Sequence, residues 1–393
     1  MPDFLRFPYI IPFLLLGAFA SMMAVLFTPA LPELTEAFHL VPAQSQWAMT
    51  IYLIGFAVGP LLYGPLGNKL GRRKTVLFGI GLAIVGSFIS SIAASFEMLC
   101  LGRLLQGLGA SVGFKMTGTM IGDSCSGSAA TKALGILYLG LAILPYAGLT
   151  IGGFLTTWFG WRGPFVFCTL YSAFLFVCCL WLPETAKQLH SDALQWKQIV
   201  HKYLAQFKNR TLILLSIYFG LGTGVIYVFA NQAPFIGIDW MQLSPKEYGL
   251  FGLLLPIGMI VGLTMANRLA EKVSANKAFI FGMVCIGFST LLMGICFLED
   301  WRSGWSLFIP QMLLLIGPFF TGPFGYGKAL SDATDKSNAS AVFQFLNLSC
   351  AMLGTLFAGM WMPQTAIALP IVYICILAGM FAAWVGLRKQ RTL

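Results

Sequence analysis

The chain is a succession of apolar runs, each about 20 residues long, which are separated by short polar segments. A helix of that length just crosses the hydrocarbon core of a bilayer. Hydropathy places these runs near residues 8–30, 44–66, 75–95, 98–120, 132–155, 163–182, 210–230, 246–266, 278–297, 304–326, 339–361 and 368–387. The sequence therefore predicts an all-α integral membrane protein with twelve transmembrane helices.

Composition supports this fold class and argues against a catalytic or metal-binding function. The chain is 58% hydrophobic and 10% charged, whereas a soluble domain is about 25% charged. The first run is too long for a signal-peptide core, so we expect it to remain as helix one. The nine cysteines show no metal-ligand or disulfide spacing. With no catalytic triad, phosphate loop or metal site in the pattern, we expect neither an enzyme nor a bound metal or cofactor.

The cations lie mostly on one side of the predicted membrane. If both termini are cytoplasmic, only Arg162, Lys246 and Arg302 of the 24 Lys and Arg residues fall in outside loops. Short Lys/Arg-rich loops resist translocation, so this placement explains the net charge of +10 without a nucleic-acid partner. We expect a multi-pass protein of a bacterial-style inner membrane with both termini in the cytoplasm.

The one long internal loop, residues 183–209, divides the chain into two sets of six spans, residues 1–182 and 210–393. Apolar residues recur at helical spacing between Trp196 and Phe207, with lysines between them. This pattern predicts an amphipathic helix on the inner membrane surface. A disordered tether is the alternative.

The turn between the second and third runs reads Y-G-P-L-G-N-K-L-G-R-R-K, residues 63–74. It resembles the loop between helices two and three of the major facilitator superfamily of transporters, G-x-L-a-D-R-x-G-R-R. The resemblance implies that the turn latches the cytoplasmic face shut, with its arginines reaching acids such as Asp123. The match falls on Gly64, Leu66, Gly71, Arg72 and Arg73, with Lys69 for the family's first arginine and Asn68 for its aspartate.

The fourth run contains L-G-R-L-L-Q-G-L-G-A-S, residues 101–111. This stretch resembles the R-x-x-Q-G-x-G motif of the proton-coupled antiporters in that superfamily. The resemblance implies that Arg103, with Gln106, takes part in proton coupling or conformational closure. The alternative is that Arg103 extends outward to the membrane surface and only anchors the helix.

The end of the fifth run, P-Y-A-G-L-T-I-G-G-F-L (145–155), resembles the antiporter pattern at Gly152 and Gly153, although the proline position is Leu149. The segments L-P-E-T (182–185), Y-V-F-A-N-Q-A-P-F-I (227–236), L-S-P-K-E-Y-G-L-F-G (243–252) and S-N-A-S-A (337–341) look like the bicyclomycin-resistance branch of the twelve-helix drug/proton antiporters. The resemblance implies two six-helix halves with a substrate cavity between them near the midplane, opened alternately to either side.

The acids depart from this family. All 14 fall in a loop or at the end of a run, whereas such antiporters usually carry a membrane carboxylate in helix one, where this chain has Val25. The fourth run instead contains Lys115. We interpret Lys115 as an anchor for an anionic substrate. Alternatively, it extends to the inner surface or pairs with Asp123.

Polar and aromatic side chains inside the runs are the candidate substrate contacts, although such groups often only join helices. They are Lys115, Tyr52, Tyr138, Tyr146, Tyr227, Asn231, Gln344 and Asn347. The candidate coupling or gating residues are Arg103, Gln106, Gly64, Asn68, Gly71, Arg72, Arg73, Asp123, Gly152 and Gly153.

Secondary active transport is the function that the sequence favours: proton-coupled export of small organic molecules, as in multidrug efflux, by alternating access. The first alternative is a transporter of an organic anion such as a carboxylate metabolite or siderophore. An alternative of another class is a non-transporting membrane sensor or scaffold. The expected partners are a small-molecule substrate, protons and the lipid bilayer, and we expect a monomer.

Overall fold

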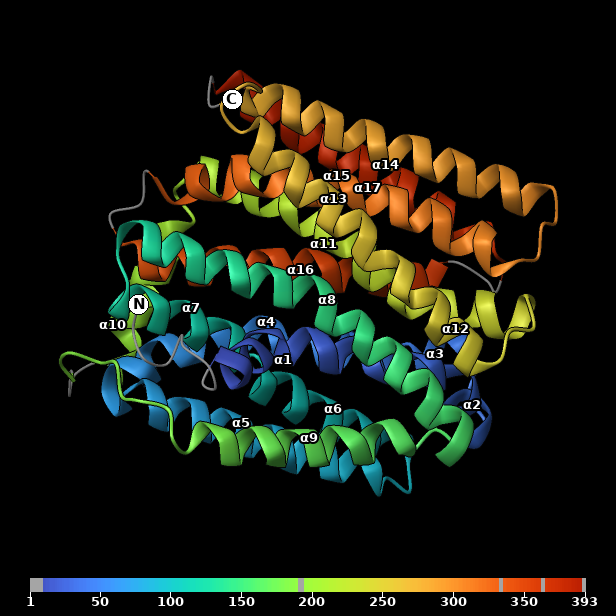
Figure 1. Ribbon diagram of the computed structural model, residues 1–393, viewed down its shortest axis with the longest axis horizontal. Coiled ribbons are helices and arrows are strands. Elements are labelled where there is room, and N and C mark those ends of the chain that lie inside the picture. Colours follow the sequence, from blue (N-terminus) through green and yellow to red (C-terminus); the bar gives the residue numbers. More distant parts are fainter. Residues whose placement is uncertain (1–9, 190–193, 332–334, 362–364, 391–393) are drawn as a thin grey trace.

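The computed structural model describes residues 10–189, 194–331, 335–361 and 365–390, and all regular structure in these ranges is helical (Figure 1). The first half contains long helices together with shorter helical segments. They are α1 (Ile10–Leu26), η2 (Thr28–Ala30), α2 (Leu31–Ala37), α3 (Pro42–Ser45), α4 (Trp47–Leu70), α5 (Arg72–Ser91), α6 (Phe96–Ala110), α7 (Val112–Ser124), α8 (Gly127–Phe159) and α9 (Gly163–Cys179).

The second half follows a short connecting helix, α10 (Trp196–Gln206). Its elements are α11 (Arg210–Pro234), the π-helical η4 (Phe235–Trp240), α12 (Pro245–Phe251), η5 (Gly252–Leu254), α13 (Leu255–Leu269), α14 (Ala275–Leu298), α15 (Gly304–Ser331), α16 (Lys336–Trp361) and α17 (Ala368–Lys389).

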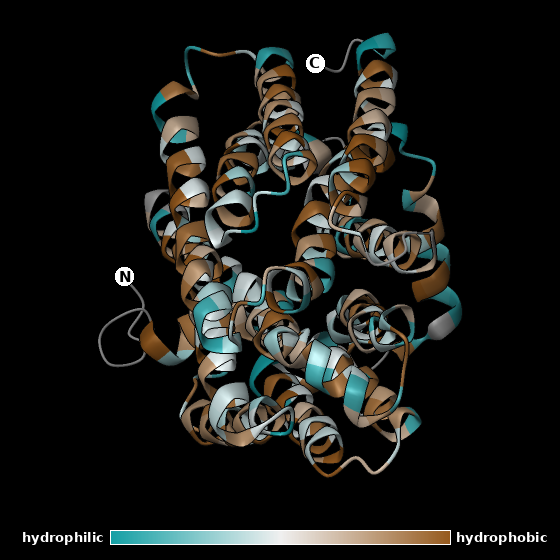
Figure 2. Cartoon of the chain, turned by 90° about the vertical axis from the view of Figure 1, so that its right-hand side faces the viewer, coloured by the Kyte–Doolittle hydropathy of each residue, from teal (hydrophilic) through white to brown (hydrophobic). Residues whose placement is uncertain are grey.

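Ten stretches of the described chain are helical, long enough and apolar enough to cross a membrane. Two further spans consist of shorter helices. α9 is a shorter apolar helix, and the fourth span is divided into α6 and α7, which Ser111 alone separates. Together they make the twelve-span all-α fold that the sequence predicts. Hydrophobic residues cover much of the helical ribbon (Figure 2), and large side chains such as Phe78, Leu170, Phe288 and Leu291 are exposed. Lipid satisfies such a surface, whereas water does not.

The helices form two packed groups with α8 and α16 running between them (Figure 1). One large apolar cluster is built mainly from the first half and a second mainly from the second half. The first residues of α1 and the last residues of α17 lie at the same end of the bundle, here called the terminal end (Figure 1). The opposite end, where α2, α3 and α12 lie, is called the far end.

The connecting segment contains the helix expected from its apolar spacing. α10 contacts α16, and the Tyr203 hydroxyl donates a hydrogen bond to the Leu61 carbonyl of α4 at 2.9 Å. Burial raises the pKa of Tyr203 to about 12, so the hydroxyl keeps its proton at neutral pH. α10 therefore touches both halves, while Val200 and Leu204 on its outer side remain exposed.

Candidate functional site

A cavity of about 1270 Å³ lies between the two halves. One wall comes from α1, α4, α7 and α8, and the other from α11, α13, α15, α16 and α17. The cavity begins in the middle of the bundle, at Tyr146 and Tyr227, and reaches Lys132, Asn267 and Gly327 at the terminal-end turns of α8, α13 and α15.

Aromatic side chains make up a substantial part of the cavity wall. They include Tyr138, Tyr146, Tyr218, Tyr227, Tyr326, Phe56, Phe114, Phe219, Phe319 and Phe343. Among the described residues that line the cavity, Lys132 carries the only formal charge, and none is an Asp or Glu. The site can therefore supply ring contacts and neutral hydrogen bonds, but no carboxylate.

A small set of neutral polar groups faces this aromatic space. Gln344 and Asn347 are one turn apart on α16 and thus share a face of that helix. Neither side chain, nor the Tyr146 hydroxyl, has a hydrogen-bond partner among the described residues. The Tyr218 hydroxyl, in contrast, donates to the Phe279 carbonyl at 3.0 Å. Gln344, Asn347 and Tyr146 are thus free to bind a ligand.

The structure brings many of the predicted substrate contacts into one place. Tyr138 and Tyr146 come from α8, Tyr227 from α11, and Gln344 and Asn347 from α16, and all five line the cavity. These helices are far apart in the sequence, and the cavity is where they meet.

Three of the predicted substrate contacts lie elsewhere. The Tyr52 hydroxyl donates to the Ala20 carbonyl at 2.6 Å, inside the first half. The Asn231 side chain is fully buried, and its amide has no hydrogen-bond partner in the described part of the chain. Neither residue lines the cavity as it stands.

Lys115 is also outside the cavity lining. Its side chain is only 9% exposed, and its ammonium lies 3.5 Å from the Ser337 carbonyl at the start of α16. This places Lys115 at a contact between the two halves near the terminal end. Asp123, the partner considered for Lys115, instead forms an ion pair with Arg72.

Sequence reasoning missed several lining residues. Lys132 stands near a helix end, where a cation is expected at the membrane surface. Phe56 and Phe114 are indistinguishable from lipid-facing phenylalanines in an apolar run. Val25, which takes the position of the family's helix-one carboxylate, also lines the cavity. The alignment with the antiporter family was the one sequence signal that pointed to Val25.

Close helix packing seals the far end. A Cβ atom on Gly153 would lie 2.3 Å from the Pro245 carbonyl oxygen, and one on Gly152 would lie 1.8 Å from that of Leu26. The Thr150 hydroxyl donates to the Gly249 carbonyl at 2.7 Å, joining α8 to α12 across the halves. Glycine at 153 permits this approach between the halves, and glycine at 152 lets α8 pack closely against α1 within the first half.

At the far end, side-chain amides and hydroxyls also join α11 and α16 of the second half to the first half near the start of α4. Gln232 of α11 donates to Gln46 at 3.2 Å. Thr50 of α4 and Thr355 of α16 lie 3.4 Å apart. The cavity therefore reaches the terminal end while both flanks of the far end are in contact.

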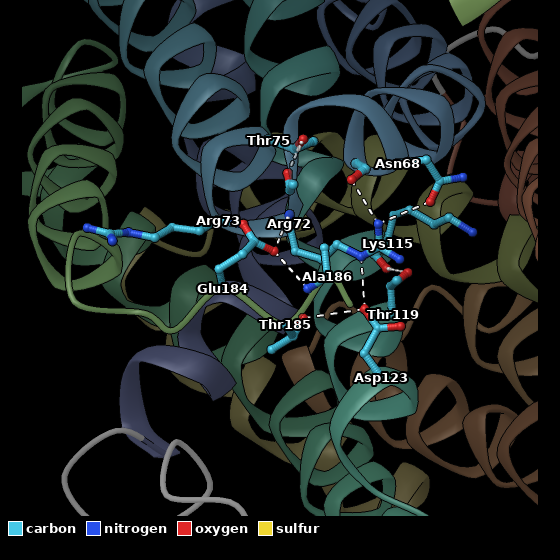
Figure 3. A network of polar contacts seen from close by, with 12 residues as sticks. Asn68, Arg72, Arg73, Thr75, Lys115, Thr119, Asp123, Glu184, Thr185 and Ala186 are labelled. Atoms are coloured by element: carbon cyan, nitrogen blue, oxygen red, sulfur yellow. Dashed lines mark hydrogen bonds and ion pairs between the residues drawn. The ribbon is translucent and has the colours of Figure 1, made fainter. Parts of the chain in front are cut away.

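The turn at residues 63–74 forms a polar network at the terminal end (Figure 3). Arg72 Nε is 2.8 Å from Asp123 Oδ2, and Arg72 Nη1 donates to the carbonyl of Gly67 at 2.8 Å and to Asn68 Oδ1 at 3.1 Å. One guanidinium thus ties α4 to α7. Gly64 lies beside the network, where an added Cβ would be 3.9 Å from Lys115 Cε.

Glu184, in L-P-E-T, has a role that the sequence did not reveal. Its carboxylate accepts the backbone N–H groups of Arg72 at 2.9 Å and Arg73 at 3.2 Å, the first residues of α5. A carboxylate is favoured at a helix N-terminus because the first N–H groups have no helical partner. Gly71, at φ +93°, makes the turn possible, and a Cβ there would lie 2.4 Å from Glu184. The Arg73 guanidinium donates to the Leu180 carbonyl.

Arg103 is held wholly inside the first half. Its side chain is 0% exposed, and its guanidinium carbon lies 3.9 Å from the ring centre of Phe27 and 4.2 Å from that of Tyr52. It donates to Gln106 Oε1 at 2.5 Å and to the carbonyls of Ala48 and Met23 at 3.1 and 3.3 Å. Its other terminal nitrogen, Nη2, has no partner among the described residues. Arg103 therefore does not extend to the membrane surface.

Residues 13–359 match the sequence profile of the Major Facilitator Superfamily. The chain belongs to this superfamily. It is accordingly a multi-pass membrane transporter and not an enzyme. No group of three or more His, Cys, Asp or Glu suited to a metal ion occurs in the described ranges.

Relatives within the superfamily include resistance proteins. The chain is 31% identical over 341 residues to an uncharacterized transporter of Rickettsia bellii, covering 84% of each chain. It is 30% identical over 302 residues to a chloramphenicol resistance protein of Pseudomonas aeruginosa, covering 76% of this chain and 70% of that one. With multidrug resistance protein D of Escherichia coli, identity is 26% over 326 residues, covering 80% and 79%. These relatives match the drug/proton antiporter branch.

Solved structures agree at the level of fold. A D-xylose-proton symporter superposes with a TM-score of 0.76 over 95% of both chains, at 15% identity. A transporter of the POT family, solved with 5-aminolevulinic acid, superposes with a TM-score of 0.77 over 98% of both chains, at 14% identity. These superpositions show that the chain shares the fold of these two transporters.

Proposed function

We propose that this transporter exports small organic molecules by proton-coupled alternating access. The observation that carries the proposal is the aromatic cavity between the halves, which reaches one end of the bundle while the other end is sealed. Resistance to chloramphenicol and other drugs among its relatives supports export as the direction.

The gating contacts fit a rocking motion of residues 1–182 against 210–393. The far end closes where Gly153 of α8 meets Pro245 of α12. Closing the terminal end would bring the cavity turns of α8 toward those of α13 and α15. The network of Arg72, Asn68 and Asp123 would then act as a preformed surface against which the second half docks.

The distribution of cations supports a bacterial inner membrane with both termini in the cytoplasm. The terminal end would then face the cytoplasm, and the described conformation would be open inward. The buried, incompletely bonded guanidinium of Arg103 is the group that we assign to coupling. The chain would work as a monomer, because each half completes the cavity of the other.

The organic-anion alternative loses the residue that motivated it. Lys115 contacts the Ser337 carbonyl between the halves and does not face the cavity. Lys132 remains on the lining, near its opening. Lys132 is the one cation of the described lining and lies near the opening, whereas the rest of that lining is neutral, which favours export of neutral compounds.

Everted membrane vesicles test this function. With the vesicle lumen acidified, the protein should drive accumulation of labelled chloramphenicol in the lumen, and nigericin should abolish that accumulation. Vesicles without the protein are the control.

Uptake in the opposite direction would contradict export. Accumulation that survives collapse of the pH gradient would contradict proton coupling. Absence of any saturable flux would contradict transport of this class of molecule.

A further inference from the structure

We infer that the cavity selects uncharged aromatic solutes and rejects organic cations. This inference rests on the proposed export function and names the substrate class of the same cavity. It follows from the charges that the cavity wall contains and from those that it lacks.

No carboxylate is available to a cation inside the described cavity. Asp123, the acid nearest in sequence to the lining on α7, is paired with Arg72 at 2.8 Å. Asp335 caps α16, accepting the Asn338 backbone N–H at 3.1 Å and its side-chain amide at 2.7 Å. The charged group that does line the cavity is Lys132, which has the same sign as the excluded solute.

The energies favour rejection. Moving an unpaired ion from water into an apolar site costs several kcal/mol. A cation over an aromatic face regains about 0.5–2 kcal/mol, and Lys132 at the opening reduces this gain by repulsion. An organic cation thus binds unfavourably even though the wall is rich in rings.

An uncharged ring compound pays only a small desolvation free energy when it enters the same cavity. The rings of Tyr138, Tyr227 and Phe343 provide apolar contact, which stabilises roughly in proportion to the buried area. Gln344 and Asn347 then offer amide donors and acceptors along one helix face. The matching ligand is a planar ring that carries hydroxyl, nitro or amide groups and no net charge.

A binding measurement with three probes tests the sign of the charge directly. Purified protein is loaded with labelled chloramphenicol, an uncharged nitroaromatic amide. Tetraphenylphosphonium and tetraphenylborate then compete for the site, because these two ions match in size and differ in sign. We expect saturable chloramphenicol binding, with each ion competing at least about tenfold more weakly than unlabelled chloramphenicol.

A single substitution should reverse the selectivity. Gln344→Glu keeps the side-chain shape and puts a carboxylate on the wall. At pH 8, where this carboxyl should ionise, tetraphenylphosphonium should bind at least about tenfold more tightly than to the unaltered protein. Gln198→Glu makes the same chemical change on the exposed face of α10 and should leave all three affinities unchanged.

Three results would overturn the inference. These are equal competition by tetraphenylphosphonium and unlabelled chloramphenicol, no gain for the cation in Gln344→Glu, and tighter binding of tetraphenylborate than of chloramphenicol. The first two leave gradient-driven export intact if vesicles still accumulate chloramphenicol. A folded protein that neither binds nor transports chloramphenicol contradicts the proposed function itself.

Discussion

Arg103 has hydrogen bonds to three elements and forms no ion pair with an acid in the described ranges. Backbone carbonyls of α1 and α4, the Gln106 amide, and two aromatic faces take the place of a counter-charge. A fully buried cation is costly in a membrane protein unless dipoles or partners compensate. Arg103 joins α1, α4 and α6, and α4 packs against α16 of the second half, so we expect a change at Arg103 to affect how the first half moves.

Arg103→Ala should stop gradient-driven export but spare chloramphenicol binding, because Arg103 does not line the cavity. Leaving buried acceptors unpaired should lower the free energy of unfolding by about 1–3 kcal/mol. Arg103→Lys keeps the charge without the planar fork and should rescue export poorly. Vesicle flux, binding and thermal unfolding are measured on the same preparations. Normal export by the alanine variant would show that Arg103 joins the helices of the first half but takes no part in coupling.

At the scale of helices, the far-end contact depends on glycine. α8 approaches α12 closely because Gly153 has no side chain, and the Thr150 hydroxyl can then reach the Gly249 carbonyl. A methyl group at position 153 would meet backbone, which cannot move aside as a flexible side chain can. Gly81 of α5, which does not line the cavity, has open space around it.

Gly153→Ala should therefore hold the far end apart and lower export by at least about tenfold. Gly81→Ala, on α5 and outside the cavity lining, is the control and should export at the normal rate, since its added methyl meets nothing within 4 Å. Export rates in vesicles at equal protein amounts check both variants. Equal rates for the two would show that this contact does not gate transport.

The spans were largely predictable from apolar length, but the details of several helices were not. α4 continues through Pro60 and Pro65 to Leu70, because membrane helices tolerate proline where neighbours satisfy the freed backbone groups. The fourth span is interrupted at Ser111, which no hydropathy pattern indicates. The cap that Glu184 provides for α5 joins residues more than a hundred positions apart, so local sequence could not reveal it.

For the whole molecule, the fold could be predicted from the sequence more completely than the cavity residues. Gln344 and Tyr146 could be proposed as cavity residues because polar groups in apolar runs are unusual, and both line the cavity. Tyr52 and Lys115 share that property but face Arg103 and α16 instead. Hydropathy indicates depth in the membrane but not the rotation of a helix about its axis, and the rotation decides which polar group meets the cavity.

We expect the two halves to rock about this cavity, opening one end as the other closes. Spin-label pairs across the halves measure this motion, in a protein whose nine native cysteines have been replaced. Gly135→Cys with Gly327→Cys reports on the terminal end, where both sites have open space. Trp158→Cys with Leu253→Cys reports on the far end, where both side chains are exposed.

Pulsed electron paramagnetic resonance measures the distances within these two pairs, with and without chloramphenicol and at two pH values. We expect opposite changes: the terminal-end pair shortens in the conditions in which the far-end pair lengthens. Distances that stay fixed at both ends, or that lengthen and shorten together, would contradict this rocking motion.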